Sequence, residues 1–400
     1  MLNDFKQVYI DRYQDVFNKV LVGMKIASTR LQAGLKYGES VTRTKYDLSS
    51  VIVRDVTNLV DRTVDTITDS EELLAVDQKK GTTFAVSSHE MTQAGPLNPA
   101  FEIGKQAAIK TATYIDADIL YEATNAFAAF DNGNLTTGAP TGTAITVSTT
   151  TVPQMIAQAP ARLRVNNQSL SNLAWVVDSY ALSQISQYIL SKNIDMAGSE
   201  FRNGFAGKVA NAEMYVSENL TGEAVLSIAT NLTADDTVSI GGVTWTCKAV
   251  PSVAGEFDLG ANVDATRVIL ANAINGSATG AESAAGYYDV SAANRAILTA
   301  LRITATDSPS GDTITVVGKG SGRLTVAETL TDGTDTWTKN FVHAYFGKKG
   351  AIDVVIQDKV DIEVRPEPKQ RSDNILSDVL YGIKTFNDGS QGFLDVHINA

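Results

Sequence analysis

Residues 38–97 read as a long extended excursion, and this stretch constrains the fold more than any other part of the chain. β-branched and polar residues dominate it, and Lys79-Lys80-Gly81 precedes a returning strand. The predicted strands are 51–56, 62–68 and 82–86, with a helical turn at 70–74. A two-stranded ribbon is marginal in water unless something covers one face, and its free edges recruit other chains. We therefore expect this extended loop either to fold back on its own body or to lie across another subunit.

A long helix is predicted at 98–130, directly after the extended loop. Asn98 offers a side-chain oxygen to the free amides of a first turn, and Pro99 lacks an N–H that this turn would leave unpaired. Asp131-Asn132-Gly133 is predicted to end the helix. At about 1.5 Å per residue its length would be on the order of 50 Å, so we expect a structural beam.

The remaining body mixes helices and strands. Apolar residues every three or four positions in residues 1–37 predict an N-terminal helical arm, lying on its own domain or on a neighbouring copy. Beyond the long helix, strands alternate with helices, which indicates an α/β layer arrangement. The predicted strands are 144–147, 173–177 and 214–216, and the predicted helices are 152–163 and 180–189.

Residues 222–340 form an insert with a different composition, rich in Thr, Ser and Gly. The runs 236–245 and 312–317 alternate between turn glycines, which is typical of short antiparallel strands, and one helix is predicted at 265–274. We expect a small, separately folding β-rich domain whose ends lie close together. After it come predicted strands at 351–356, 360–364 and 392–398, and a helical stretch at 377–382.

Charge and cysteine content exclude several classes of protein. A net charge of −12 argues against a basic face that wraps nucleic acid. The single cysteine, Cys247, excludes an internal disulfide framework. The first residues lack the pattern of a signal peptide, and no run approaches the roughly 20 apolar residues of a membrane span. A soluble protein that folds in a reducing cytosol is expected.

No pattern in the sequence predicts a catalytic, cofactor or metal site. Gly318-Lys319-Gly320-Ser321-Gly322 lacks the spacing of a phosphate-binding loop and is interpreted as a hairpin turn. His89, His343 and His397 are far apart in sequence, without partners at metal-ligand spacing. The acidic turns 307–312 and 332–335 do not fit the twelve-residue calcium loop. Trp245 and Trp337 are expected in the core of the insert.

In the order of these segments the chain resembles the major capsid proteins of tailed bacteriophages, of the type that carries a domain inserted in the axial domain. The residues that carry the resemblance are AVDQKKGTTFAV at 75–86 with Glu90 and Gln93, YIDAD at 114–118, WVVD at 175–178, GFAG at 204–207, MYVSENL at 214–220, and Tyr381-Gly382. The insert resembles, less closely, β-rich modules of phage structural proteins.

The resemblance implies an α+β fold and a division of the chain into seven parts. These are the N-terminal arm (1–37), the extended loop (38–97), the spine helix with a peripheral strand (98–150), the first part of the axial domain (151–221), the inserted β-rich domain (222–340), the axial and peripheral return (341–385) and a C-terminal peripheral strand (386–400).

The function implied by the resemblance is self-assembly into hexamers and pentamers of an icosahedral shell. Such a shell would enclose DNA without sequence-specific binding, with scaffolding, portal and decoration proteins as further partners and the insert on the outside. The side chains assigned to contacts between subunits are Arg54, Arg62, Lys79, Lys80, Phe84 and Glu90. For Lys79 and Lys80, solvated turn charges or ordinary salt bridges are favoured over an isopeptide link. A tail protein or a bacterial compartment shell is the alternative, and an enzyme is not expected.

Overall fold

The computed structural model describes residues 21–32, 39–47, 51, 65–87, 97–165, 168–191, 205–209, 211–276, 286–367 and 372–399. Of the predicted N-terminal arm, only 21–32 lies within these ranges, with a short helix α2 (Gly23–Ile26). The predicted strand 51–56 lies outside them except for its first residue. The predicted mixture of helices and strands is confirmed.

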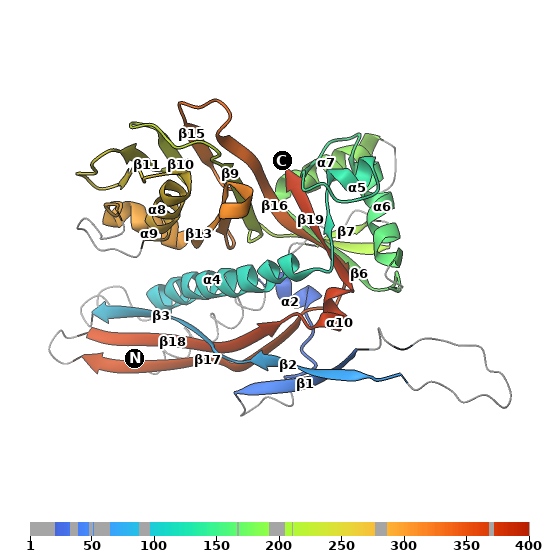
Figure 1. Cartoon of the computed structure of the whole chain (residues 1–400). Coiled ribbons are helices and arrows are strands. Elements are labelled where there is room, and N and C mark those ends of the chain that lie inside the picture. Colours follow the sequence, from blue (N-terminus) through green and yellow to red (C-terminus); the bar gives the residue numbers. More distant parts are fainter. Residues whose placement is uncertain are drawn as a thin grey trace.

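Helix α4 (Leu97–Tyr121) crosses the middle of the molecule, above a three-stranded sheet and below the insert (Figure 1). One face is fully buried, at Ala108, Ala112, Ile115 and Ile119, which follow the 3.6-residue period. The helix is shorter than predicted, because a 3-10 turn at Glu122–Asn125 and strand β4 (Ala129–Phe130) replace its last part. Asp131 does not end it. That side chain instead accepts from the Asn134 amide and caps the next helix, α5 (Asn132–Thr136).

The sheet beneath α4 has the strand order β17-β18-β3 and is antiparallel throughout. Its strands are β17 (Asp353–Glu367), β18 (Ser372–Lys384) and β3 (Gln78–Ser87). The helical stretch predicted at 377–382 is therefore wrong. Ile375, Val379 and Tyr381 are buried and are separated by even numbers of residues, as expected for one face of a strand. Ile375 and Val379 are also four residues apart, and this spacing fits a helix equally well.

A separate two-stranded ribbon joins β1 (Ser40–Asp47) to β2 (Thr68–Ala75), in the register Ser40↔Ala75 to Asp47↔Thr68. The helical turn predicted at 70–74 is wrong, because these residues pair along β2 with β1. The strand predicted at 82–86 is confirmed as part of β3, which pairs with β18 of the chain's own body and not with the ribbon. At the base of the ribbon, a Cβ atom at Gly382 would lie 2.3 Å from the Ala75 carbonyl oxygen. The close approach of the β18 backbone to the end of β2 therefore requires glycine at this position.

A ten-stranded mixed sheet forms the rest of the body, and seven of its strands follow the order β13-β14-β9-β16-β6-β8-β7. The other three are β19, which pairs with β16, and β4 and β5, which both pair with β19. The strands predicted at 144–147, 173–177, 214–216 and 392–398 are confirmed as members of this sheet. Helices α6 and α7, both predicted, pack on it through Met155, Leu163 and Ile185. The bounds are β5 (Ile145–Thr146), α6 (Val152–Val165), β6 (Leu173–Val177), α7 (Ser179–Ser191), β7 (Phe205–Val209), β8 (Ala212–Val216), β9 (Thr221–Ser227), β13 (Ile303–Ser308), β14 (Thr313–Gly318), β16 (Thr336–Lys348) and β19 (Phe393–Asn399).

Strands β9, β13 and β14 of the insert belong to this sheet. That the insert folds separately stays a prediction. Its two ends lie close together, as predicted, because β9 and β16 are antiparallel partners that place Ala224 opposite Asn340. It has its own core around Trp245, Phe257 and Leu270. It holds a second helix that the sequence analysis missed. The further elements are β10 (Thr237–Ile240), β11 (Val243–Lys248), β12 (Glu256–Asp258), α8 (Val263–Asn275), α9 (Ala292–Ala300) and β15 (Val326–Thr329).

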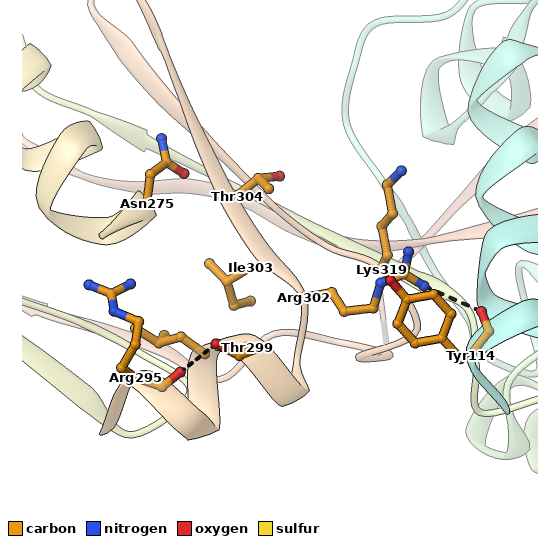
Figure 2. A pocket seen from close by; sticks show the side chains of 9 residues that line it. Tyr114, Asn275, Arg295, Thr299, Arg302, Ile303, Thr304 and Lys319 are labelled. Carbon is orange, nitrogen blue, oxygen red and sulfur yellow. Dashed lines mark hydrogen bonds between the residues drawn. The ribbon is translucent and has the colours of Figure 1, made fainter. Parts of the chain in front are cut away.

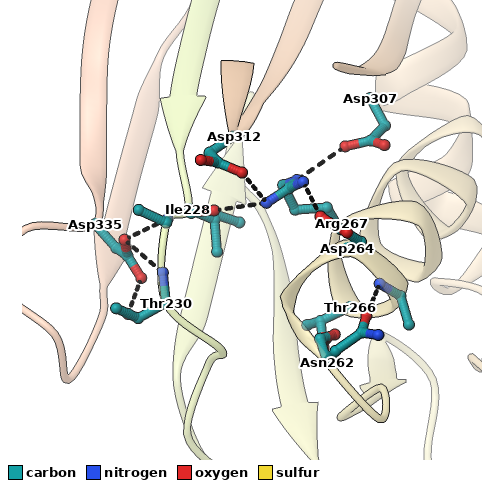
Figure 3. Close-up of polar contacts among 11 residues, drawn as sticks. Ile228, Thr230, Asn262, Asp264, Thr266, Arg267, Asp307, Asp312 and Asp335 are labelled. Carbon is teal, nitrogen blue, oxygen red and sulfur yellow. Dashed lines mark hydrogen bonds and ion pairs between the residues drawn. The ribbon is translucent and has the colours of Figure 1, made fainter. Parts of the chain in front are cut away.

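One arginine organises the polar interior of the insert (Figure 3). Arg267 is fully buried on α8, and its guanidinium donates to Asp307 at 3.1 Å, to Asp312 at 3.1 Å and to the Ile228 carbonyl at 2.9 Å. It also pairs with Asp264 one turn earlier on the helix. A buried guanidinium needs such a full set of acceptors, because desolvation otherwise makes it strongly destabilising.

Candidate assembly surfaces

The ribbon of β1 and β2 lies along the lower edge of the molecule, below α10 (Asn387–Ser390) (Figure 1). Its two faces differ in exposure. Leu74 is fully buried against Val76, Val355 and Phe386, whereas the neighbouring Leu73 is 52% exposed on the other face. Since successive residues of a strand point to opposite faces, one face of the ribbon belongs to the chain's own core and the other is open to a partner.

Polar contacts fix the base of the ribbon to the segment between β18 and β19. Arg43 donates two hydrogen bonds to the Asp388 carboxylate, at 2.9 and 2.6 Å. The Glu72 carboxylate accepts from the backbone amide of Asn387. A two-point guanidinium–carboxylate contact sets direction as well as distance, so the ribbon leaves the body at a defined angle.

Three of the six residues assigned to subunit contacts can be located, and each has a partner within its own chain. Lys79 forms an ion pair with Asp378 at 3.2 Å, although its side chain stays 70% exposed. The Lys80 ammonium lies 5.3 Å from the centre of the Tyr114 ring. Phe84 packs beside α4 on the main core. Arg54, Arg62 and Glu90 lie outside the described residues. The contacts between subunits stay a prediction.

The insert meets α4 at a cavity of about 430 Å³ (Figure 2). The Arg302 guanidinium lies 3.8 Å from the centre of the Tyr114 ring and pairs with the Asp118 carboxylate. The other Asp118 oxygen accepts from the Tyr381 hydroxyl at 2.5 Å. Lys319 lies 3.7 Å from the centre of the Tyr121 ring, and burial lowers the pKa of its ammonium. These contacts join the insert, the long helix and the sheet beneath it.

The three histidines are far apart in the sequence, but the fold brings two of them together. His343 on β16 lies directly opposite His397 on β19, and Asp395 precedes His397 by two residues on the same face. The Asp395 Oδ2 atom lies 2.8 Å from His343 Nδ1 and 3.1 Å from His397 Nε2. Burial alone would lower the pKa of His343, but the carboxylates of Asp395 and Glu223 outweigh it and raise the pKa to about 9. The signal that could have found this cluster is the Asp-x-His alternation on the last strand.

Among the described residues, no helix has the length and apolar content needed to cross a bilayer. Residues 318–322 form a turn, in which Gly318 ends β14 and Gly320 and Gly322 adopt left-handed backbone angles. The expected hairpin is wrong, because β14 pairs with β13 and β9 whereas the next strand, β15, pairs with β10 in another sheet. Trp245 is fully buried in the insert, as expected, and Trp337 packs partly buried against the same core.

Comparison with known proteins gives no match to a family model and no match to a curated protein. Solved structures do match. A chain of Mycobacterium phage Che8 is 14% identical, with 95% of this chain and 91% of that chain covered, at a TM-score of 0.50. The capsid of cyanophage P-SCSP1u (10% identity, 90% and 84% covered, TM-score 0.45) and the mature capsid of bacteriophage PhiM1 (12%, 95% and 87%, 0.45) are similar to a lesser degree. The chain therefore shares its fold with the phage Che8 chain over nearly its whole length.

Proposed function

We propose that this protein is the major capsid protein of a tailed bacteriophage, a structural subunit that assembles into the hexamers and pentamers of an icosahedral shell. The observation that carries the proposal is the agreement in fold, over 95% of the chain, with a chain of Mycobacterium phage Che8. The order of the elements along the chain supports the same role. A ribbon, a long helix over a sheet and a mixed sheet follow one another, as the resemblance to phage major capsid proteins implies.

The open face of the ribbon supplies the physical reason for assembly. Leu73 is 52% exposed on a two-stranded ribbon whose outer edges have no neighbouring strand among the described residues, and Ile67, directly before β2, is 51% exposed. Full burial of a half-exposed leucine side chain stabilises an interface by on the order of 1 kcal/mol, and pairing along the strand edges adds hydrogen bonds. A neighbouring copy in the shell would cover both, and closed symmetry repeats this gain around each capsomer.

In this role the chain acts in the virion and carries out no chemistry. DNA would be enclosed without a sequence-specific contact, because an acidic chain offers no basic surface for counterion release. Scaffolding, portal and decoration proteins are the further partners that a closing shell of this kind uses, and the insert would lie on its outer side.

Electron microscopy of the purified full-length chain, expressed alone and with any scaffolding protein that its source encodes, tests the proposal. We expect closed shells with six-fold and five-fold capsomers. Shells that form around a non-viral cargo protein would favour the compartment alternative. Tubes with helical symmetry would favour a tail protein, and a stable monomer under both conditions would contradict the shell role.

A further inference from the structure

We propose that His343, Asp395 and His397 form a binding site for one divalent transition-metal ion of the zinc type. These side chains come from β16 and β19, two adjacent strands of the ten-stranded sheet. Because His343 and His397 are opposite each other and Asp395 is two positions from His397, all three project from the same face. The nitrogen and oxygen atoms they offer lie within 4.8 Å of one another.

The distances fit a metal centre after small side-chain rotations. Around a tetrahedral zinc ion with bonds of about 2.0–2.1 Å, ligand atoms lie roughly 3.3 Å apart. The Asp395 oxygen already lies 2.8 Å from His343 Nδ1 and 3.1 Å from His397 Nε2. The two imidazoles therefore converge on one carboxylate oxygen, which is the arrangement that an ion between them requires.

Two polar atoms in this cluster are buried without a hydrogen-bond partner. They are His397 Nδ1 and Asp395 Oδ1. The surroundings are dry, since the side chains of His343 and Asp395 are only 5% and 9% exposed. Buried polar atoms are rarely left unpaired, and an ion that is not present is one of the accepted explanations. A cation bound through both oxygens of Asp395 would engage Oδ1, whereas His397 Nδ1 is not the ring nitrogen that faces Asp395.

The neighbouring side chains would support an ion in this place. The Glu223 carboxylate lies 3.3 Å from His343 Nε2 and can hold that ring with Nδ1 turned toward Asp395. A carboxylate behind a ligating histidine fixes the tautomer and makes the ligand more basic. Phe341 stacks on the His397 ring with centroids 4.3 Å apart. Both rings are thus held before any ion binds, which lowers the entropic cost of coordination.

The donor set selects the class of ion. Two imidazoles and one carboxylate suit zinc, cobalt or nickel, whereas magnesium and calcium prefer oxygen ligands alone. Three protein ligands leave a fourth position for water. The ion would cross-link the C-terminal strand to β16 beside the strand pair that begins and ends the insert.

The test is a titration of the full-length chain with zinc chloride by calorimetry, after treatment with a chelator and dialysis. We expect one zinc ion per chain in the wild type and an affinity at least 100-fold lower in His397→Gln and in Asp395→Asn. Glu223→Gln, which removes only the supporting carboxylate, should weaken binding about 10-fold. His89→Gln is the matched control and should bind like the wild type.

Because His343 and Asp395 are buried, circular dichroism must show that each variant is folded. His397→Gln is the decisive variant, since its ring is the most exposed of the three at 13%. Cobalt chloride gives a second readout, because a cobalt ion at this site would show the visible absorption of a low-coordinate complex. The proposal is overturned if the wild type binds no zinc at a defined ratio, if its cobalt spectrum is that of the hydrated ion, or if His397→Gln binds as tightly as the wild type.

Discussion

The guanidinium of Arg302 lies over the ring of Tyr114, 3.8 Å from its centre, and this stack joins the insert to the long helix. Arg302 has a left-handed backbone with φ of 51°, a conformation that costs a non-glycine residue about 1–2 kcal/mol. The stack and the ion pair with Asp118 offset that cost. The Lys80 ammonium of β3 lies 5.3 Å from the centre of the same ring. Tyr114 is thus a common contact of the insert, the helix and the sheet below.

Replacing Arg302 by alanine should loosen this junction. The stack and the buried ion pair are lost while the backbone strain remains, so we expect the free energy of unfolding to fall by about 2 kcal/mol. Hydrogen exchange should speed up first in α9 and β13. Arg302→Gly loses the same contacts but relieves the strain, so it should be less destabilising than Arg302→Ala. Lys248→Ala, at an exposed pair with Asp235, is the control and should change nothing. Equal stability of Arg302→Ala and the control would refute the role of the stack.

Asp116 should make stability depend on pH with a definite sign. Its carboxylate is fully buried and accepts from the Gly23 amide at 2.5 Å, from Ser217 Oγ at 3.1 Å and from Asn219 Nδ2 at 3.0 Å. Burial outweighs these bonds and raises the pKa of Asp116 above 3.8. A raised pKa means that the folded state binds the proton more tightly. Its stabilising contribution is therefore complete below the unfolded pKa and is lost as pH rises through the folded pKa.

Two substitutions at Asp116 separate the hydrogen bonds from the charge. Asp116→Ala should lower the free energy of unfolding by about 3 kcal/mol at pH 7, because three donors lose their acceptor. Asp116→Asn keeps the shape and part of the bonding, and it should remove the loss of stability that ionisation of Asp116 causes as pH rises above the unfolded pKa of an aspartate. Denaturant melts at a series of pH values measure both. A wild-type stability that rises with pH relative to Asp116→Asn would contradict the assignment.

Arg267 is expected to be the most sensitive polar residue of the insert. Its removal leaves Asp307 and the Ile228 carbonyl without their donor, and breaking a buried pair from one side costs about 3–5 kcal/mol. Arg267→Ala should therefore unfold the insert at lower denaturant than the wild type, with Trp245 fluorescence as the probe. Arg267→Lys should fall between the two, because one ammonium cannot reach all the acceptors. Asp264→Ala, at the most exposed partner, is the control. If Arg267→Ala unfolds at the same denaturant concentration as this control, the hydrogen bonds of Arg267 do not stabilise the insert.

Cys247 should be inert to thiol reagents in the folded protein. It is fully buried, and burial together with Asp236, Asp258 and Asp235 raises the pKa of the thiol to about 12. The thiolate is the reactive form of cysteine. With a thiol pKa of about 12, the thiolate fraction at pH 8 is negligible. Labelling with a maleimide should be absent in buffer and should reach one equivalent per chain in denaturant. Rapid labelling under native conditions would show that the insert opens around β11.

Local patterns in the sequence were sufficient where one periodicity dominated. The strand at 173–177 and the helices at 152–163 and 180–189 are found close to their predicted bounds, because a continuous apolar run or an amphipathic stripe admits one reading. At 377–382 apolar residues fit both periods, and only pairing with β17 and β3 decides for a strand. At 70–74 the run Ser70-Glu71-Glu72 favours a helical turn locally, and the pairing with β1 overrides it.

Contacts between distant segments were beyond local patterns. His343 and His397 meet only because β16 and β19 are adjacent strands. The two residues are 54 positions apart in the chain, and no local sequence pattern predicts that they pair. The same holds for Arg302 and Tyr114, which come from the insert and the long helix. The order of segments predicted the architecture, whereas strand pairing determined which side chains meet.

Leu73 and Leu74 provide a direct test of the ribbon's role in assembly, because they are chain neighbours on opposite faces. Leu74 is fully buried and Leu73 is 52% exposed. Leu74→Ala should destabilise the ribbon by about 2–3 kcal/mol, since it leaves a cavity beside Phe386. Leu73→Lys should leave the free energy of unfolding of the monomer unchanged within about 0.5 kcal/mol. It should nevertheless prevent closed shells, because a charge would be buried against the neighbouring copy. Denaturant melts and electron microscopy of the same preparations separate the two effects. Normal shells from Leu73→Lys would show that the open face of the ribbon is not an assembly contact, even if the shell role itself holds.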